Sequence, residues 1–204
     1  MRGRGDWRAA LLLLAAAATA REVVRLGYFT EAQPFEVACA RGWFEAADLE
    51  IEVVCLPQSA GVGAVSKIDD GDLEISLLGS TPAAAAIARG VKLKNYYVAH
   101  LKGESQALLV RPDIVSPADL QDMTIGTPFG STAHFYSTYI PVVSGVEFNL
   151  VDCNDDCPEL YDAGKIDGAF VWGPRMAALK DRGATILYTA RLLGEWLCGN
   201  QPVS

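Results

Sequence analysis

Two short stretches of the chain place glycine, serine and threonine together where a strand is expected to give way to a helix. They are LLGSTP (77–82) and TPFGSTAHF (127–135). In each stretch, glycine allows close approach of the backbone, and two hydroxyls join the unpaired N–H groups of a helix N-terminus. Because such a terminus also carries partial positive charge, it suits a small anion. Paired across a cleft, the stretches would form a cage for a tetrahedral anion, although each alone is also an ordinary helix cap.

The candidate donors are Ser80 and Thr81 in the first stretch, and Ser131, Thr132 and His134 in the second. Ser131 and His134 lie three residues apart on the expected helix, so they could also be a nucleophile and its base. The serine lacks a G-x-S-x-G sequence, and no acid is placed to orient the imidazole, so a ligand-facing or internally satisfied histidine is favoured.

A tryptophan ends another expected strand at the same edge. Trp172 closes the sequence AFVW, and its ring could stack on the apolar part of a ligand. Packing in the core or at a hinge is an equally good interpretation of the pattern.

The elements that must position these residues alternate along the chain. Strands are expected at 22–29, 49–56, 92–100, 106–111, 123–128, 146–152, 166–172 and 184–189, and 70–79 is expected to be a turn followed by a strand. Helices are expected between them at 34–47, 59–68, 80–90, 116–122, 130–140, 157–164 and 174–183. This alternation predicts an α/β protein with mainly parallel sheets, in which ligands bind beyond the carboxyl ends of the strands.

The expected domain organisation is two lobes, at 21–102 and 103–190, with a hinge in LKGES (101–105) and a final segment, 191–204. A single continuous sheet is the alternative.

The first twenty residues have the features of a secretory signal peptide. Three arginines precede a short apolar run, and Ala18-Thr19-Ala20 is an A-x-A cleavage pattern, so cleavage after Ala20 is expected. The chain would then be periplasmic or secreted; an N-terminal membrane anchor is the alternative.

Charge narrows the classes of partner. The chain has 17 basic and 25 acidic residues, and removing three arginines and one aspartate with residues 1–20 leaves 14 and 24, a net charge of −10. That sign argues against nucleic acid as a partner. A single small anion can still be held by backbone N–H groups and hydroxyls.

Five cysteines are present, and Cys153 and Cys157 are close enough in sequence to form a disulfide in a secreted protein. A zinc site is disfavoured because no second cysteine pair or nearby histidine accompanies them, and no metal or other cofactor is expected. Nucleotide binding is also disfavoured, since GVGAVSKIDDGD lacks a third glycine and any G-K-[ST] sequence.

Four blocks together resemble the substrate-binding proteins of bacterial taurine and alkanesulfonate ABC importers, most closely the taurine-binding type. They are LGSTPAAAA, SQALLVR, TIGTPFGSTAHFY and KIDGAFVWGP, and the resemblance runs from about Val23 to Trp196. It implies a periplasmic-binding-protein-like "Venus flytrap" that closes on a small sulfonate and delivers it to an ABC permease, without catalysis.

The resemblance also implies roles for individual residues. Ser80 and Thr81 would bind the sulfonate from lobe one, and Ser131, Thr132 and His134 from lobe two. Trp172 would flank the ligand and Gln33 would line the cleft. Taurine-type relatives tend to carry an acid at the position of Gln33, so this chain departs from them at a point that would face an amine.

A second departure is length. Relatives of this type continue further and return to lobe one, so 191–204 is expected to be a truncated return segment and lobe one to be incomplete. The alternatives are a degenerate fragment that binds nothing and an enzyme like the thiamin-pyrimidine synthases of the same fold. That enzyme type carries a clustered-cysteine motif that this sequence lacks. A regulatory effector domain is disfavoured because no helix-turn-helix precedes the fold.

Overall fold

The computed structural model describes residues 21–30, 33–47, 49–58 and 61–197. The predicted signal peptide, its cleavage site and Cys198 lie outside the described residues. None of the helices in the described ranges has the length and apolarity needed to cross a membrane.

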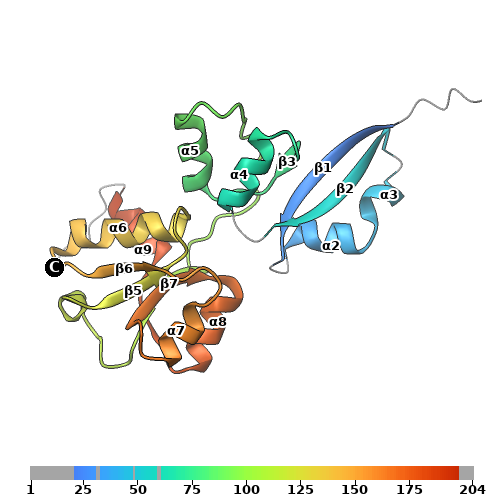
Figure 1. Ribbon diagram of the computed structural model, residues 1–204. Helices are drawn as coiled ribbons and strands as arrows, with labels where there is room; N and C mark the ends of the chain where they lie inside the picture. The colour runs from blue at the N-terminus through green and yellow to red at the C-terminus, as the bar shows by residue number, and fades with distance from the viewer. Residues whose placement is uncertain (1–20, 31–32, 48, 59–60, 198–204) are drawn as a thin grey trace, which may run out of the picture.

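The described residues form two separate sheets, so the alternative of one continuous sheet is wrong (Figure 1). The first is parallel, with the order β2-β1-β3, in which β1 (Glu22–Phe29) pairs with both β2 (Ile51–Gln58) and β3 (Ile75–Ser76). Its helices are α2 (Pro34–Ala40), α3 (Trp43–Ala46), α4 (Gly61–Asp69) and α5 (Ser80–Ala88).

The second sheet has five strands in the order β6-β5-β7-β4-β8. The strands are β4 (Gln106–Val110), β5 (Thr124–Thr127), β6 (Asn149–Asp152), β7 (Gly168–Trp172) and β8 (Thr185–Thr189). β5 is parallel to β6 and β7, whereas β4 runs antiparallel to β7 and β8. The helical elements are the 3-10 turn η1 (Pro117–Leu120), α6 (Thr132–Ser144), α7 (Cys157–Asp162), α8 (Gly173–Asp181) and α9 (Ala190–Leu197).

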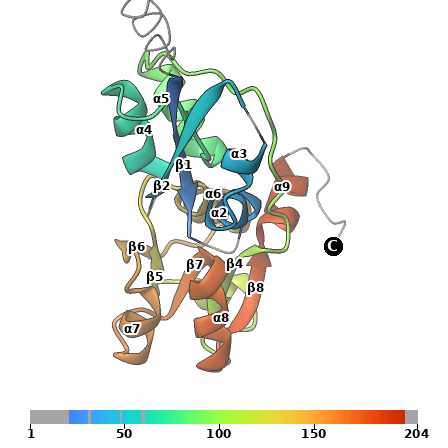
Figure 2. The ribbon, with the colours of Figure 1, turned by 90° about the vertical axis from the view of Figure 1, so that its right-hand side faces the viewer.

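Helices cover both faces of this second sheet. Successive residues of β4 point to opposite faces, as the two-residue period of a strand requires. Leu108 therefore packs with residues of α6 and α9, and Leu109 packs with residues of α7 and α8. Figure 2 shows α6 on one side of the sheet and α7 and α8 on the other. All five residues of β4 are buried, and this double cover explains its uninterrupted apolar run.

Two sequence predictions of local structure are wrong. Residues 92–100 form no strand, because no described strand pairs with them and a strand needs a neighbour for its hydrogen bonds. The helix expected over 34–47 breaks in two at Gly42, whose φ of 63° is left-handed. Over 70–79 the expected turn is present and is followed by the short strand Ile75–Ser76.

Two disulfides stabilise the part of the chain that the structure describes. One joins Cys153 to Cys157 between β6 and α7, the pairing that their spacing suggested. The other joins Cys39 in α2 to Cys55 in β2, a pairing for which the sequence offered no signal.

Candidate functional site

The two Gly-Ser-Thr stretches lie at the start of α5 and α6 and are in contact. The backbone N–H of Thr81 faces Thr132 Oγ1 across a long N···O distance of 3.5 Å. A Cβ added to Gly79 would lie 2.7 Å from the same oxygen, closer than side chains pack. Glycine at position 79 is therefore what allows the two helix ends to meet.

Gly130 allows a second close approach between the two lobes. Its φ is 76°, which favours glycine, and an added Cβ would lie 2.7 Å from Val62 Cγ2 in α4. Both glycines are thus required by an approach between elements that are far apart in the sequence.

Ser131 and His134 are engaged within the first turn of α6. Ser131 Oγ accepts a hydrogen bond from the His134 N–H (3.2 Å) and donates one to the carbonyl of Pro128 (2.6 Å). His134 Nδ1 accepts from the Gly130 N–H (3.2 Å), and its ring stacks on Phe129 with centroids 4.4 Å apart. The serine is therefore an N-cap, and its hydroxyl hydrogen is directed at a carbonyl rather than at the imidazole.

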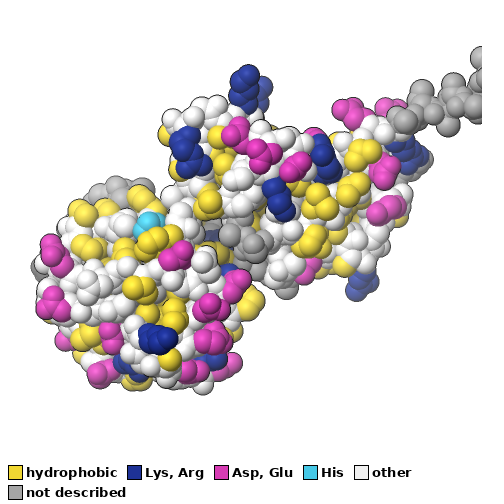
Figure 3. All heavy atoms as spheres, in the orientation of Figure 1, with side chains coloured by type: hydrophobic (Ala, Val, Ile, Leu, Met, Phe, Trp, Pro, Cys, Tyr) yellow, Lys and Arg dark blue, Asp and Glu magenta, His cyan; other side chains and the backbone are white. Residues whose placement is uncertain are grey.

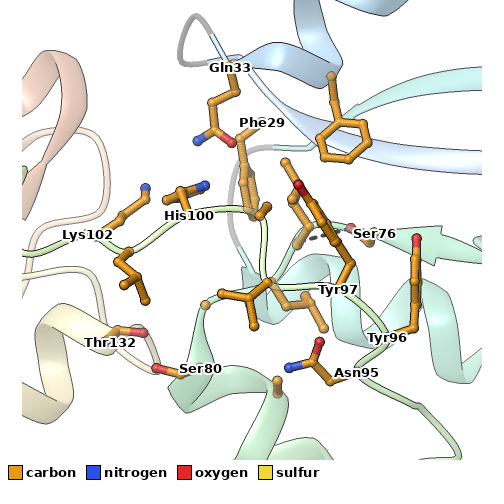
Figure 4. A pocket seen from close by; sticks show the side chains of 18 of the residues that line it. Phe29, Gln33, Ser76, Ser80, Asn95, Tyr96, Tyr97, His100, Lys102 and Thr132 are labelled. Atoms are coloured by element: carbon orange, nitrogen blue, oxygen red, sulfur yellow. Dashed lines mark hydrogen bonds between the residues drawn. The ribbon is translucent and has the colours of Figure 1, made fainter.

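A cleft of about 500 Å³ lies between the lobes. Of the predicted site residues, Gln33, Ser80 and Thr132 line it, whereas Thr81, Ser131, His134 and Trp172 are outside its lining. Figure 4 shows the Ser80 and Thr132 side chains directed toward one another at one end of the cleft, with Gln33 at the other.

Much of the cleft wall was not foreseen from the sequence. Residues 93–103, which connect the lobes, line it continuously, and Gln106 and Tyr136 line it from the second lobe. The expected hinge at 101–105 lies in the same connection. The polar and aromatic residues of NYYVAH are the available signal, but the same residues also favour a strand.

Trp172 stands next to the cleft lining. It ends β7 and is half-buried, with Lys102 Nζ 5.7 Å and Arg175 Cζ 5.1 Å from its ring centroid. Lys102 does line the cleft. The indole therefore contacts a cleft residue through a cation–π interaction.

Hydrogen bonding shifts the pKa of Glu74, which is outside the cleft lining but adjacent in sequence to the lining residue Ile75. The largest perturbation is at Glu74, where hydrogen bonds from Arg25 lower the pKa to about 2. Within the described ranges, no three His, Cys, Asp or Glu side chains are grouped so that they could hold a metal ion. The side chains that line the cleft include hydroxyl, amide and cationic groups, and such a set is suited to binding an anion.

Known proteins resemble this chain in both sequence and fold. The taurine-binding periplasmic protein of Escherichia coli (strain K12) is 33% identical over 197 residues, which is 95% of this chain and 61% of that protein. The alkanesulfonate-binding protein SsuA from Xanthomonas axonopodis pv. citri, bound to MOPS, superposes with a TM-score of 0.77 at 21% identity. That match covers 87% of this chain and 64% of the other.

The periplasmic aliphatic sulphonate binding protein SsuA from Escherichia coli gives a TM-score of 0.73 at 20% identity, over 82% of this chain and 60% of that one. The chain thus spans less than two thirds of the length of each of these relatives. At such identities the two solved structures show the fold alone, and they confirm the predicted α/β periplasmic-binding-protein-like architecture with mainly parallel sheets. The sequence pattern described as "NMT1/THI5 like" matches residues 29–190, and the chain therefore belongs to the NMT1/THI5 like family.

Proposed function

We propose that this chain is an extracytoplasmic solute-binding component of an ABC importer, and that its cleft captures a small organosulfonate. The observation that carries the proposal is the meeting of the α5 and α6 N-termini at one end of the cleft, through Gly79, Thr81 and Thr132. The taurine-binding and alkanesulfonate-binding relatives support the same ligand class.

The chemistry of the two helix ends fits a sulfonate. Its three oxygens are acceptors that share one negative charge, and they need several donors from different directions. The first N–H groups of each helix lack partners within the helix and carry partial positive charge, and Ser80 and Thr132 add hydroxyls at the cleft. A sulfonate held by both helix ends would couple the two lobes.

The proposal divides the chain into lobes at 21–102 and 103–190 that move about the connection near 101–105. A ligand that contacts both lobes stabilises the closed arrangement, which a permease can then recognise.

Binding rather than catalysis is the proposed role. A nucleophilic Ser131 would need its hydroxyl hydrogen to be directed at the His134 imidazole, but that hydrogen bond goes to the Pro128 carbonyl. We expect a sulfonate incubated with the protein to be recovered unchanged, as NMR spectroscopy of the ligand would show.

Titration calorimetry with ethanesulfonate tests the proposal. We expect the Thr132→Ala variant to bind about tenfold more weakly or worse, because a hydrogen bond to a charged group contributes about 1.5–3 kcal/mol. Thr138→Ala is the matched control: its hydroxyl is on the same helix but is exposed and bonded to the Phe135 carbonyl. If a folded sample binds no sulfonate, the proposal is wrong.

The proposed location is the periplasm or another extracytoplasmic space, with the signal peptide removed after Ala20. N-terminal sequencing of the secreted chain would give Arg21 as the first residue. Recovery of the chain with residues 1–20 attached to the membrane would support the anchor alternative instead.

A further inference from the structure

A short loop beside the β5–α6 connection is closed on itself by a disulfide. This disulfide loop (153–157) joins β6 to α7, and Cys153 and Cys157 at its two ends are bonded to one another. Cys153 is 3% exposed and Cys157 is fully buried. The loop also bonds to β5, since the Cys153 N–H donates to the Thr127 carbonyl (3.4 Å). A cross-link limits the conformations that the enclosed backbone can adopt.

The disulfide packs directly against the strand that leads to α6. A Cβ added to Gly126 in β5 would lie 3.0 Å from Cys153 Sγ, so glycine leaves the space that this sulfur occupies. On the other side of the loop, Asp155 forms an ion pair with Arg175 of α8. The Asp155 side chain is exposed, and ion pairs at the surface contribute little, so the disulfide is the main constraint on the loop.

Asp152, the last residue of β6, links this loop to the β5–α6 connection. Its Oδ1 accepts a hydrogen bond from the Phe129 N–H (3.1 Å), and its Oδ2 accepts one from Asn154 Nδ2 in the disulfide loop (3.4 Å). The carboxylate is therefore held between the loop and Phe129. Phe129 lies three residues before Thr132, which lines the cleft.

The bond to Phe129 fixes the turn from which α6 starts. The Phe129 ring stacks on His134, and the Gly130 N–H donates to His134 Nδ1, so residues 129–134 form one connected turn. A backbone N–H held at position 129 therefore limits where the Thr132 hydroxyl can lie.

We propose that Asp152 is a positioning residue for the sulfonate site and that the Cys153–Cys157 disulfide keeps it in place. None of these three residues lines the cleft. They act by holding the start of α6, so that the Thr132 hydroxyl and the first N–H groups of the helix stay where the sulfonate binds. The inference rests on the proposed function, because it concerns how that site is held.

Charge alone predicts the opposite effect of removing Asp152. This residue is exposed, the chain carries a net charge of −8, and Figure 3 shows acidic side chains over the visible face of the second lobe. If Coulomb repulsion were the only effect, removing one carboxylate near a bound anion would raise the affinity for that anion. A fall in affinity would instead report the lost hydrogen bond to Phe129.

Titration calorimetry with ethanesulfonate at low ionic strength tests the role of Asp152. We expect Asp152→Ala to weaken binding about fivefold, which corresponds to a start of α6 that is in its binding arrangement about one fifth of the time. Asp152→Asn removes the same charge but keeps an oxygen acceptor for the Phe129 N–H, so it should bind at least as tightly as the wild type. Glu147→Ala is the control, because it removes an exposed carboxylate of the same lobe outside this network, and it should not weaken binding.

The disulfide is tested by changing Cys153 and Cys157 together to serine, because a reductant reaches a buried disulfide slowly. We expect this double variant to bind ethanesulfonate about three- to fivefold more weakly. Leu179→Ala is the stability control: Leu179 is fully buried in the same hydrophobic cluster as both cysteines, so its loss loosens that layer without opening the loop. The control should keep the wild-type Kd.

A measurement without ligand separates this inference from the proposed function. Because hydrogen-bonded amide protons resonate downfield, the Phe129 amide proton should move upfield in NMR spectra of Asp152→Ala and stay near its wild-type position in Asp152→Asn. If the wild type binds no sulfonate, the proposed function is wrong and the inference falls with it. If the wild type binds and Asp152→Ala binds as tightly although its Phe129 resonance has moved, the inference alone is wrong. A wild-type Kd in the double serine variant would overturn the role of the disulfide.

Discussion

Replacing Gly79 by alanine isolates the contact between the lobes at the sulfonate end of the cleft. The backbone at this position has φ −67° and ψ 155°, which alanine adopts without strain. The added Cβ would lie 2.7 Å from Thr132 Oγ1 and 3.4 Å from the ring of Pro82. Thr132 must therefore withdraw by roughly 0.7 Å to restore ordinary contact in a close-packed structure.

The expected effect is a loss of affinity with little loss of stability. The withdrawal moves the Thr132 hydroxyl out of its place at the cleft, and losing its charge-assisted hydrogen bond to the sulfonate weakens binding about 10- to 100-fold. Stability should fall by less than about 1 kcal/mol, because Gly→Ala replacement at an allowed conformation itself stabilises by about 0.4–1 kcal/mol and partly offsets the close contact.

Titration calorimetry with ethanesulfonate and thermal unfolding of the same samples would measure both quantities. Gly63→Ala in α4 is the matched control, since nothing lies within 4 Å of the added Cβ. That control should keep the wild-type Kd and unfold at a slightly higher temperature, because alanine favours helix interiors. Wild-type affinity in Gly79→Ala would refute the role of this contact.

Three further outcomes concern stability. Arg25 lowers the pKa of Glu74 from 4.5 to about 2, so the stabilisation from the Arg25–Glu74 pair should be present above pH 4.5 and lost as the pH falls through about 2. Glu74→Gln should flatten this part of the curve of unfolding temperature against pH. Removing the Cys39–Cys55 disulfide by a double Cys→Ser change should lower the free energy of unfolding by about 3 kcal/mol, the value for a loop of similar length, and an unchanged denaturant midpoint would contradict it. Phe170→Ala should cost about 3–5 kcal/mol in urea unfolding because the ring is fully buried, and a cost under 1 kcal/mol would show that the core closes around the gap.

Local signals predicted the elements that bear the site. The sequence predicted a strand over 123–128 and a helix over 130–140, and the structure has β5 ending at Thr127 and α6 beginning at Thr132 and running on to Ser144. Such signals act between neighbours in the chain, since a cap satisfies N–H groups only two or three residues away. Because these signals extend over only a few residues, they are compatible with Ser131 as a ligand donor and with Ser131 as a helix cap, and they do not decide between the two roles.

Predictions from the sequence are wrong or missing where a residue's partner in a strand pair or a disulfide is distant in the chain. Residues 92–100 have apolar and aromatic side chains suited to a strand, but a strand exists only beside another strand, and the described ones leave this segment unpaired. The segment instead lines the cleft. The Cys39–Cys55 pairing was equally hidden, because it depends on how α2 packs on β2.

The sequence by itself determined the α/β class, the family and the two Gly-Ser-Thr helix starts, because composition, periodicity and caps are properties of contiguous residues. Only the tertiary structure decided that these two starts touch, that Gln33 and Gln106 share a cleft with Lys102, and that Ser131 and His134 are engaged with their own turn. The physical reason is that a binding site is a set of distances between side chains far apart in the chain, and those distances are set by the packing of two sheets and their helices.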